Sequence, residues 1–194
     1  QSGKSNIVSR LKSIGIDFKQ DDPKIKKLLE EVKDREFIGY SYDGADASFE
    51  LLARRIMGEI PRYISIKEYD VTVKKDKSGN IISSAKAQLE VDKKLSICEG
   101  EGNGPVNAID SALRKALVAF YPSLDNLKLT DYKVNIISPE KGTGATTRVI
   151  VESTDKTGKH WTTIGVSPNI IDASYNALHD SIIYKLYHDL NAKK

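Results

Sequence analysis

The stretch of this sequence whose residue types are best suited to binding chemistry is GEGNGP, residues 100–105, which leads directly into an expected helix. The first N–H groups of a helix have no partner inside it, and the helix dipole places partial positive charge at the same end. Such an end binds carboxylates and phosphates. The stretch lacks the GK[ST] of a P-loop, and its G-x-G-x-G spacing differs from the dinucleotide fingerprint. Two interpretations stay open: an anion site, or glycines that allow a strand to pack closely on a helix.

Other reactive side chains are sparse. The histidines are His160, His179 and His188, and they form no HxH or HExxH pair that would hold a metal ion, so we expect them at the surface or its rim. Cys98 has no CxxC partner and falls in an expected strand, which favours a buried structural thiol. There is no GxSxG elbow for a serine nucleophile. The sequence therefore offers no recognisable catalytic site and predicts no bound cofactor.

Composition narrows the class of protein. The chain has 194 residues, 39% hydrophobic and 29% charged, which is typical of a globular protein. Thirty basic against 27 acidic residues give a net charge of +3, too balanced to require nucleic acid as a partner. No apolar run approaches the roughly 18 residues of a membrane helix. A single cysteine excludes an internal disulfide framework and favours a reducing, cytoplasmic location. The chain opens at Gln1 without a signal peptide, so we expect its natural start to lie upstream.

The first sixty residues read as helical. Asp22 and Pro23 are typical of an N-cap and first helical position, and they begin an expected helix over 24–37. A shorter helix is expected over 4–16. A third amphipathic stretch begins near Asp43 and keeps one face apolar through Ile60 until Pro61 stops it.

After Pro61 the hydrophobic period changes from that of a helix to that of a strand. Residues 81–91 alternate from Ile81 onward, and the turn DKSGN at 76–80 connects them to a strand over 63–75. A strand near 94–100 and a helix near 105–121 follow. The same order then recurs, with strands over 127–138, 146–153 and 160–166, the turn DKTGK at 155–159, and a last helix from 167–168 to about 190.

The recurrence is visible in the letters themselves. A shift of 65 positions aligns VNAIDSAL (106–113) with IDASYNAL (171–178) and places Gly100 on Gly165. The sequence therefore predicts an α+β fold: a helical linker subdomain over 1–60, then a duplicated βββα domain over 61–194 with units of about 61–122 and 123–194. One three-stranded sheet with one helix leaves a face uncovered, so we expect a pseudo-symmetric body that dimerises.

The duplication adds weight to the anion interpretation. The second unit has its own helix start at 167–169 and its own flexible stretch, KGTGA, at 141–145. Two such helix starts are suited to the carboxylate of a small zwitterion, whose ammonium group would bind Asn107 or its counterpart Asp172. Apolar residues at the strand and helix ends are candidates for holding an aliphatic side chain, with ordinary core packing as the alternative; they are Val106, Leu129, Tyr132, Ile136 and Ile170.

Several long motifs resemble one known family. GEGNGPVNAIDSALRKAL, LTDYKV and TTRVIVE…WTTIGVSPNIIDASYNAL are similar to the C-terminal regulatory, or dimer, domain of the α-isopropylmalate synthase and citramalate synthase family. QSGKSNIVSRLKSIGI and GYSYDGADASFELLARR resemble the helical linker of the same family, and the second stretch looks most like its citramalate synthase branch. The resemblance covers nearly the whole chain.

The resemblance implies a parent enzyme in which an N-terminal TIM barrel condenses acetyl-CoA with a 2-oxo acid, using a divalent metal ion. That barrel is absent here, so no catalytic residue and no metal ligand carries over to this chain. The family's regulatory domain binds the end product of the pathway. The effector-binding residues that the resemblance implies are Gly102, Gly104, Val106, Asn107, Ala108, Leu129, Tyr132, Ile136, Gly144, Ala145, Pro168, Asn169 and Ile170.

We therefore expect the allosteric regulatory fragment of an acyltransferase that resembles citramalate synthase, which joins acetyl-CoA to pyruvate in isoleucine synthesis. The fragment would bind the end-product amino acid for feedback inhibition and form a homodimer; whether it catalyses anything itself stays undecided. One alternative is the same module of a 2-isopropylmalate synthase that senses leucine. A second is an RNA-binding α+β module, disfavoured because no aromatic pair marks a stacking strand. A free-standing enzyme would need convergent reactive groups that the spacing does not offer.

Overall fold

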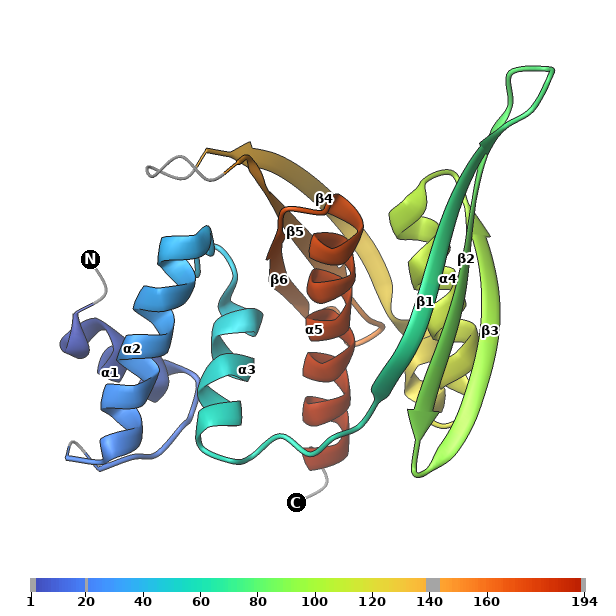
Figure 1. The fold of residues 1–194 in the computed structure, drawn as a ribbon. Coiled ribbons are helices and arrows are strands. Elements are labelled where there is room, and N and C mark those ends of the chain that lie inside the picture. Colours follow the sequence, from blue (N-terminus) through green and yellow to red (C-terminus); the bar gives the residue numbers. More distant parts are fainter. Residues whose placement is uncertain (1–2, 20, 139–143, 193–194) are drawn as a thin grey trace. The chain divides into compact units, whose positions relative to one another are not determined.

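The computed structural model describes residues 3–19, 21–138 and 144–192 (Figure 1). Its first three helices are α1 (Lys4–Ser13), α2 (Pro23–Ile38) and α3 (Asp46–Ile56). The predicted start of α2 is confirmed, since the Asp22 carboxylate accepts a hydrogen bond from the Lys24 N–H at 2.9 Å and Pro23 occupies the first turn. The sequence thus marks this helix boundary correctly by local chemistry alone.

The end of α3 differs from the prediction. The apolar face suggested a helix through Ile60, but α3 ends at Ile56. Gly58 adopts a φ of +75°, which lies in the left-handed region that favours glycine. The N–H of Glu59 then donates to the carbonyl of Arg54 at 2.8 Å, the bond that closes a helix at a glycine. Gly58, and not Pro61, therefore terminates this helix.

The first repeat contains β1 (Ser65–Lys75), β2 (Ile81–Val91), β3 (Lys94–Gly102) and α4 (Pro105–Val118), followed by a short 3₁₀ helix, η1 (Pro122–Asn126). The strands form an antiparallel sheet in the order β1-β2-β3. The predicted alternation in β2 holds from Ser83 to Val91, but Ile81 is exposed where the pattern placed it inward. The reason is the length of β3, whose last residue pairs with Ser83, so Ile81 lies beyond the third strand.

The second repeat contains β4 (Lys128–Ile137), β5 (Thr146–Thr154), β6 (His160–Ser167) and α5 (Ile170–Asn191), with the sheet order β4-β5-β6. Gly100 in the first repeat packs against the backbone of Ala108 and Ala112, and Gly165 packs against Ala173 and Ala177. The two contacts are offset by the same 65 residues as the sequence repeat. The predicted α+β class with two βββα units is therefore confirmed (Figure 1).

The chain divides into two compact units. One comprises residues 1–61, 130–153 and 160–184, and the other comprises 62–129, 154–159 and 185–194. In the first unit the three N-terminal helices share a hydrophobic core with β6: Ile7, Leu28 and Phe49 belong to the same buried cluster as Ile164 and Val166. The boundary predicted at residues 60–61 remains a prediction. Among the described residues, no helix is both long and apolar enough to span a membrane.

Candidate functional site

The start of α4 is where the glycine-rich stretch meets the helix. Gly104 is the N-cap, with φ −152° and ψ 172°, and Pro105 is the first helical residue. Gly104 has no side chain to cap the helix, so its N-cap supplies no acceptor for the N–H groups of Val106 and Asn107. Val106 is buried and the Asn107 side chain is exposed on the same turn. This turn therefore offers uncapped donors beside an exposed amide.

The glycines before α4 serve different purposes. A Cβ at Gly102 would lie 2.6 Å from the Cβ of Asn107 and 2.8 Å from the N of Ala108, so close packing requires glycine there. Gly104 has open space around its Cβ position. Close packing therefore explains why residue 102 is a glycine. It does not explain the glycine at position 104.

The start of α5 is built differently. The Oδ1 of Asn169 accepts hydrogen bonds from the N–H of Ile171 at 2.8 Å and of Asp172 at 3.2 Å, and the Ser167 hydroxyl accepts from the N–H of Asn169 at 3.1 Å. Asn169 is thus the N-cap, and the first-turn donors of α5 are already used. The sequence predicts two equivalent helix starts. In the structure, the start of α5 has a side-chain cap and the start of α4 has none. Pro168 and Ile170, the neighbours of Asn169, are exposed.

Two of the candidate residues on β4, Tyr132 and Ile136, are exposed and lie on the same face of the strand. The phenol of Tyr132 hydrogen-bonds to the Ser174 hydroxyl at 3.2 Å, and Ser174 in turn donates to the carbonyl of Ile170 at 2.7 Å. Ile136, four residues along the strand from Tyr132, is 77% exposed. Tyr132 is thus anchored to α5 by its hydroxyl, whereas Ile136 presents its side chain to solvent.

The remaining candidates are placed as follows. Gly144 and Ala145 are exposed just before β5, and 141–143 of the predicted flexible stretch lie outside the described residues. Leu129 is half-buried, and Ala108 is fully buried in α4. The structure groups the candidates by compact unit: Gly102, Gly104, Val106, Asn107, Ala108 and Leu129 belong to one, and Tyr132, Ile136, Gly144, Ala145, Pro168, Asn169 and Ile170 to the other.

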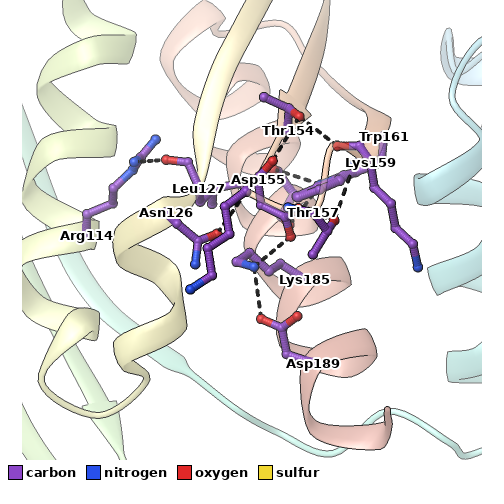
Figure 2. A network of polar contacts seen from close by, with 12 residues as sticks. Arg114, Asn126, Leu127, Thr154, Asp155, Thr157, Lys159, Trp161, Lys185 and Asp189 are labelled. Carbon is purple, nitrogen blue, oxygen red and sulfur yellow. Dashed lines mark hydrogen bonds and ion pairs between the residues drawn. The ribbon is translucent and has the colours of Figure 1, made fainter.

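A buried ion-pair cluster lies outside the predicted site (Figure 2). The Lys185 ammonium is 2.8 Å from the Asp155 carboxylate and 3.0 Å from that of Asp189, and only 3% of the Lys185 side chain is exposed. Burial alone would raise the pKa of Asp155, but hydrogen bonds from Lys185 and Thr157 outweigh it and hold that pKa below its ordinary value. The cluster borders a pocket of about 740 Å³ that Phe120, Tyr121 and Leu186 also line.

The sequence contains one signal for this cluster, which the sequence analysis missed. Lys185 lies in α5 among the buried residues Ile182, Ile183 and Leu186, so a lysine occupies a position on the apolar face of the helix. A charged residue at a buried position requires a partner of opposite charge. The partners themselves lie 30 residues before Lys185 and one helical turn after it.

The cysteine and the histidines lie apart from the candidate site residues in the sequence, and their burial differs. Cys98 is half-buried in β3, opposite Ala87 of β2, so the prediction of a buried thiol is wrong. His160 is exposed, and His179 is half-buried in α5, where burial lowers its pKa below the ordinary value. Within the described residues, no group of histidine, cysteine and carboxylate side chains is arranged to hold a metal ion.

Comparison with known proteins decides the family. The profile of the LeuA allosteric (dimerisation) domain matches residues 43–186, a region that includes α3, the first repeat and the second repeat as far as residue 186 in α5. The chain belongs to this family. The resemblance found in the sequence is therefore confirmed, and α4 lies inside the matched region.

Individual relatives of this LeuA-type domain indicate its branch. The chain is 44% identical to an (R)-citramalate synthase of Aquifex aeolicus over 189 residues, which are 97% of this chain and 36% of that protein. It is also 44% identical to an (R)-citramalate synthase of Geobacter sulfurreducens over 187 residues, 96% of the chain and 35% of the relative. A 2-isopropylmalate synthase of Aquifex aeolicus is 29% identical over 184 residues, 93% of the chain and 32% of the relative. The chain thus spans about a third of the length of these relatives.

Proposed function

We propose that this chain is the regulatory and dimerisation part of a citramalate synthase, and that it binds isoleucine as a feedback inhibitor. The observation that carries the proposal is the match to an allosteric dimerisation domain, combined with 44% identity to two citramalate synthases against 29% to a 2-isopropylmalate synthase. Citramalate synthesis leads to isoleucine, so isoleucine is the end product that such a domain would sense.

The uncapped start of α4 is the part of the chain we propose for the ligand's carboxylate. The N–H groups of Val106 and Asn107 point out of the helix end, where the dipole adds partial positive charge. The carbonyl oxygen of the neutral, exposed Asn107 amide is an acceptor for an ammonium group. The thirteen candidate residues remain predictions; among them Gly104 lies at the uncapped helix start and has open space around its Cβ position.

The proposed partners are a second copy of the chain and an N-terminal TIM barrel that carries the divalent metal and the catalytic groups. Exposed apolar side chains support association, because contiguous apolar surface marks interaction sites. Tyr132, Val134 and Ile136 lie on one face of β4, and Leu95 and Ile97 are exposed on β3. Feedback then follows from linkage: an amino acid that binds one arrangement of the dimer more tightly shifts the population toward it, by no more than its differential affinity.

Isothermal titration of the chain with L-isoleucine, L-leucine and L-valine tests the effector, with glycine as a control that has both charges and no side chain. Saturable binding that prefers isoleucine is the expected result. A preference for leucine would assign the chain instead to a 2-isopropylmalate synthase, the second candidate that the 29% match supports. Absence of heat with all four would contradict the effector part of the proposal. Light scattering after size-exclusion chromatography tests for the homodimer. A monomeric mass at a protein concentration on the order of 100 micromolar would contradict the proposed dimer.

A further inference from the structure

The linker helices cover the open edge of the second sheet. The order β4-β5-β6 leaves β6 at an edge, where backbone N–H groups need partners outside the sheet. The hydroxyl oxygen of Ser48 in α3 accepts a hydrogen bond from the N–H of Ile164 in β6 at 2.9 Å. A side chain from before residue 61 therefore satisfies a backbone donor of the β6 edge.

The same serine also binds α5. Its hydroxyl donates to the Oδ2 of Asp180 at 2.9 Å, and the Oδ1 of Asp180 accepts from the guanidinium of Arg55 in α3 at 3.0 Å. Only 3% of Ser48 is exposed, so water does not replace these bonds freely. Ser48 therefore connects α3 to both the edge strand and the helix of the second repeat.

A third attachment lies at the end of α2. The guanidinium of Arg148 in β5 donates two hydrogen bonds to the carbonyl of Gly39, at 2.8 and 2.7 Å. A Cβ at Gly39 would lie 2.9 Å from the Cδ1 of Ile137 and 3.2 Å from a methyl of Val166. The segment from Gly39 to Arg55 is thus packed on the second repeat along its length, within one compact unit.

We propose that Ser48 and Asp180 are positioning residues that make α3 and the second repeat move as one body, so that a change in β6 or α5 on effector binding reaches the helices before residue 61. The inference rests on the proposed function, since it specifies how a conformational change in the effector-binding domain is transmitted to the helices before residue 61. Ser48 is suited to the role because its single hydroxyl is donor to one element and acceptor from another. A joint movement of β6 and α5 therefore breaks both bonds of Ser48 unless α3 moves with them.

Amide hydrogen exchange of the chain, followed by mass spectrometry, tests the coupling in wild type and in the variants Ser48→Ala and Asp180→Asn. The matched control is Ser153→Ala, which removes a buried hydroxyl that hydrogen-bonds to Ser181 at 2.6 Å within the second repeat. Without ligand, we expect both coupling variants to exchange faster in α3 and at the β6 edge together, by roughly fivefold or more, and the control to leave α3 unchanged.

Saturating isoleucine supplies the second arm. We expect it to slow exchange in α3 of the wild type and of Ser153→Ala by roughly fivefold or more, and to leave α3 unchanged in Ser48→Ala and Asp180→Asn, although both still bind the ligand in titrations. Wild-type binding without a change in α3 overturns the inference and spares the proposed function. Equal protection of α3 in all four proteins also overturns it. If no ligand binds, the proposed effector function fails, and the ligand-free arm alone decides whether Ser48 and Asp180 couple the elements.

Discussion

A Cβ on Gly165 in β6 would lie 2.8 Å from the backbone nitrogen of Ala177 in α5, so the strand and the helix meet backbone to backbone. Gly100 has the same arrangement in the first repeat, where an added Cβ would meet the equivalent backbone nitrogen, that of Ala112, and would lie 2.8 Å from the carbonyl oxygen of Ala108. Contacts this short leave no space for a side chain. Each repeat therefore depends on one glycine that holds its helix against its sheet.

Substitution of Gly165 by alanine should destabilise the chain. The added methyl group clashes with helix backbone that cannot rotate away, and overpacking of this kind costs roughly 1–3 kcal/mol. Urea unfolding measures the loss. Gly44→Ala is the matched control, because its Cβ position is open, and there we expect no loss or a gain of about 0.4–1 kcal/mol from a less flexible unfolded chain. Equal stability of the two variants would contradict the close contact.

Substitution of Gly104 by aspartate should separate helix stability from ligand binding. The new carboxylate caps α4 and stabilises it by only a few tenths of a kcal/mol, because glycine is itself a tolerated N-cap, while it repels the carboxylate of an amino acid at the same helix end. We expect unfolding to require more urea and the affinity for isoleucine to fall roughly tenfold or more. Gly104→Asn supplies a cap without charge and should weaken binding less. Unchanged affinity in both variants would exclude α4 as the carboxylate site.

Replacement of Lys185 by methionine should be costly because it leaves buried carboxylates unpaired. Removing one member of a buried ion pair costs roughly 3–5 kcal/mol, and Lys159→Met, at an exposed position, should cost little. A small loss for Lys185→Met, comparable with that of the control, would show that the cluster does not stabilise the fold.

The same cluster predicts a dependence on pH. The pKa of Asp155 is lower in the folded chain than in the unfolded chain. The carboxylate therefore stabilises the fold fully at pH values above its unfolded pKa, and this stabilisation is lost as the pH falls through its folded pKa. Without Lys185, only the hydrogen bonds from Thr157 oppose the effect of burial, so the pKa of Asp155 should rise and the free energy of unfolding should begin to fall at a higher pH. Unfolding free energies between pH 3 and 7 measure the shift, and identical profiles would contradict the assignment.

His179 should make stability fall on mild acidification. Burial lowers its pKa, so the unfolded chain binds a proton near pH 6.5 that the folded chain does not yet bind. The free energy of unfolding is therefore unaffected by His179 above about pH 6.5. Below that pH it declines by up to about 1.4 kcal/mol per pH unit for one proton, until the pKa of His179 in the folded chain is reached. His179→Gln should flatten the profile between pH 7.5 and 5. A slope in His179→Gln equal to that of the wild type would contradict the prediction.

Local chemistry explains how much of the fold the sequence predicts. The capping carboxylate of Asp22, the alternation in β2 and the repeat that pairs Gly100 with Gly165 all depend on residues close in sequence or on letters that recur. Where local rules compete, the prediction fails: Gly58 stops α3 before Pro61 is reached, and the length of β3 decides that Ile81 is exposed. For the candidate site, motif resemblance identifies α4 and its glycines, but no local pattern reveals that Asn169 already caps α5.

By itself the sequence determined the element order, the duplicated βββα units and the family, because periodicity, turn chemistry and repeated letters are local properties of the chain. Tertiary structure alone decided which distant groups meet. Ser48 lies 116 residues from Ile164 and 132 from Asp180, yet one hydroxyl binds both, and Lys185 finds Asp155 thirty residues away. Such pairs arise because a buried polar group must be satisfied by whatever packing brings within hydrogen-bond reach, and sequence spacing places no limit on that distance.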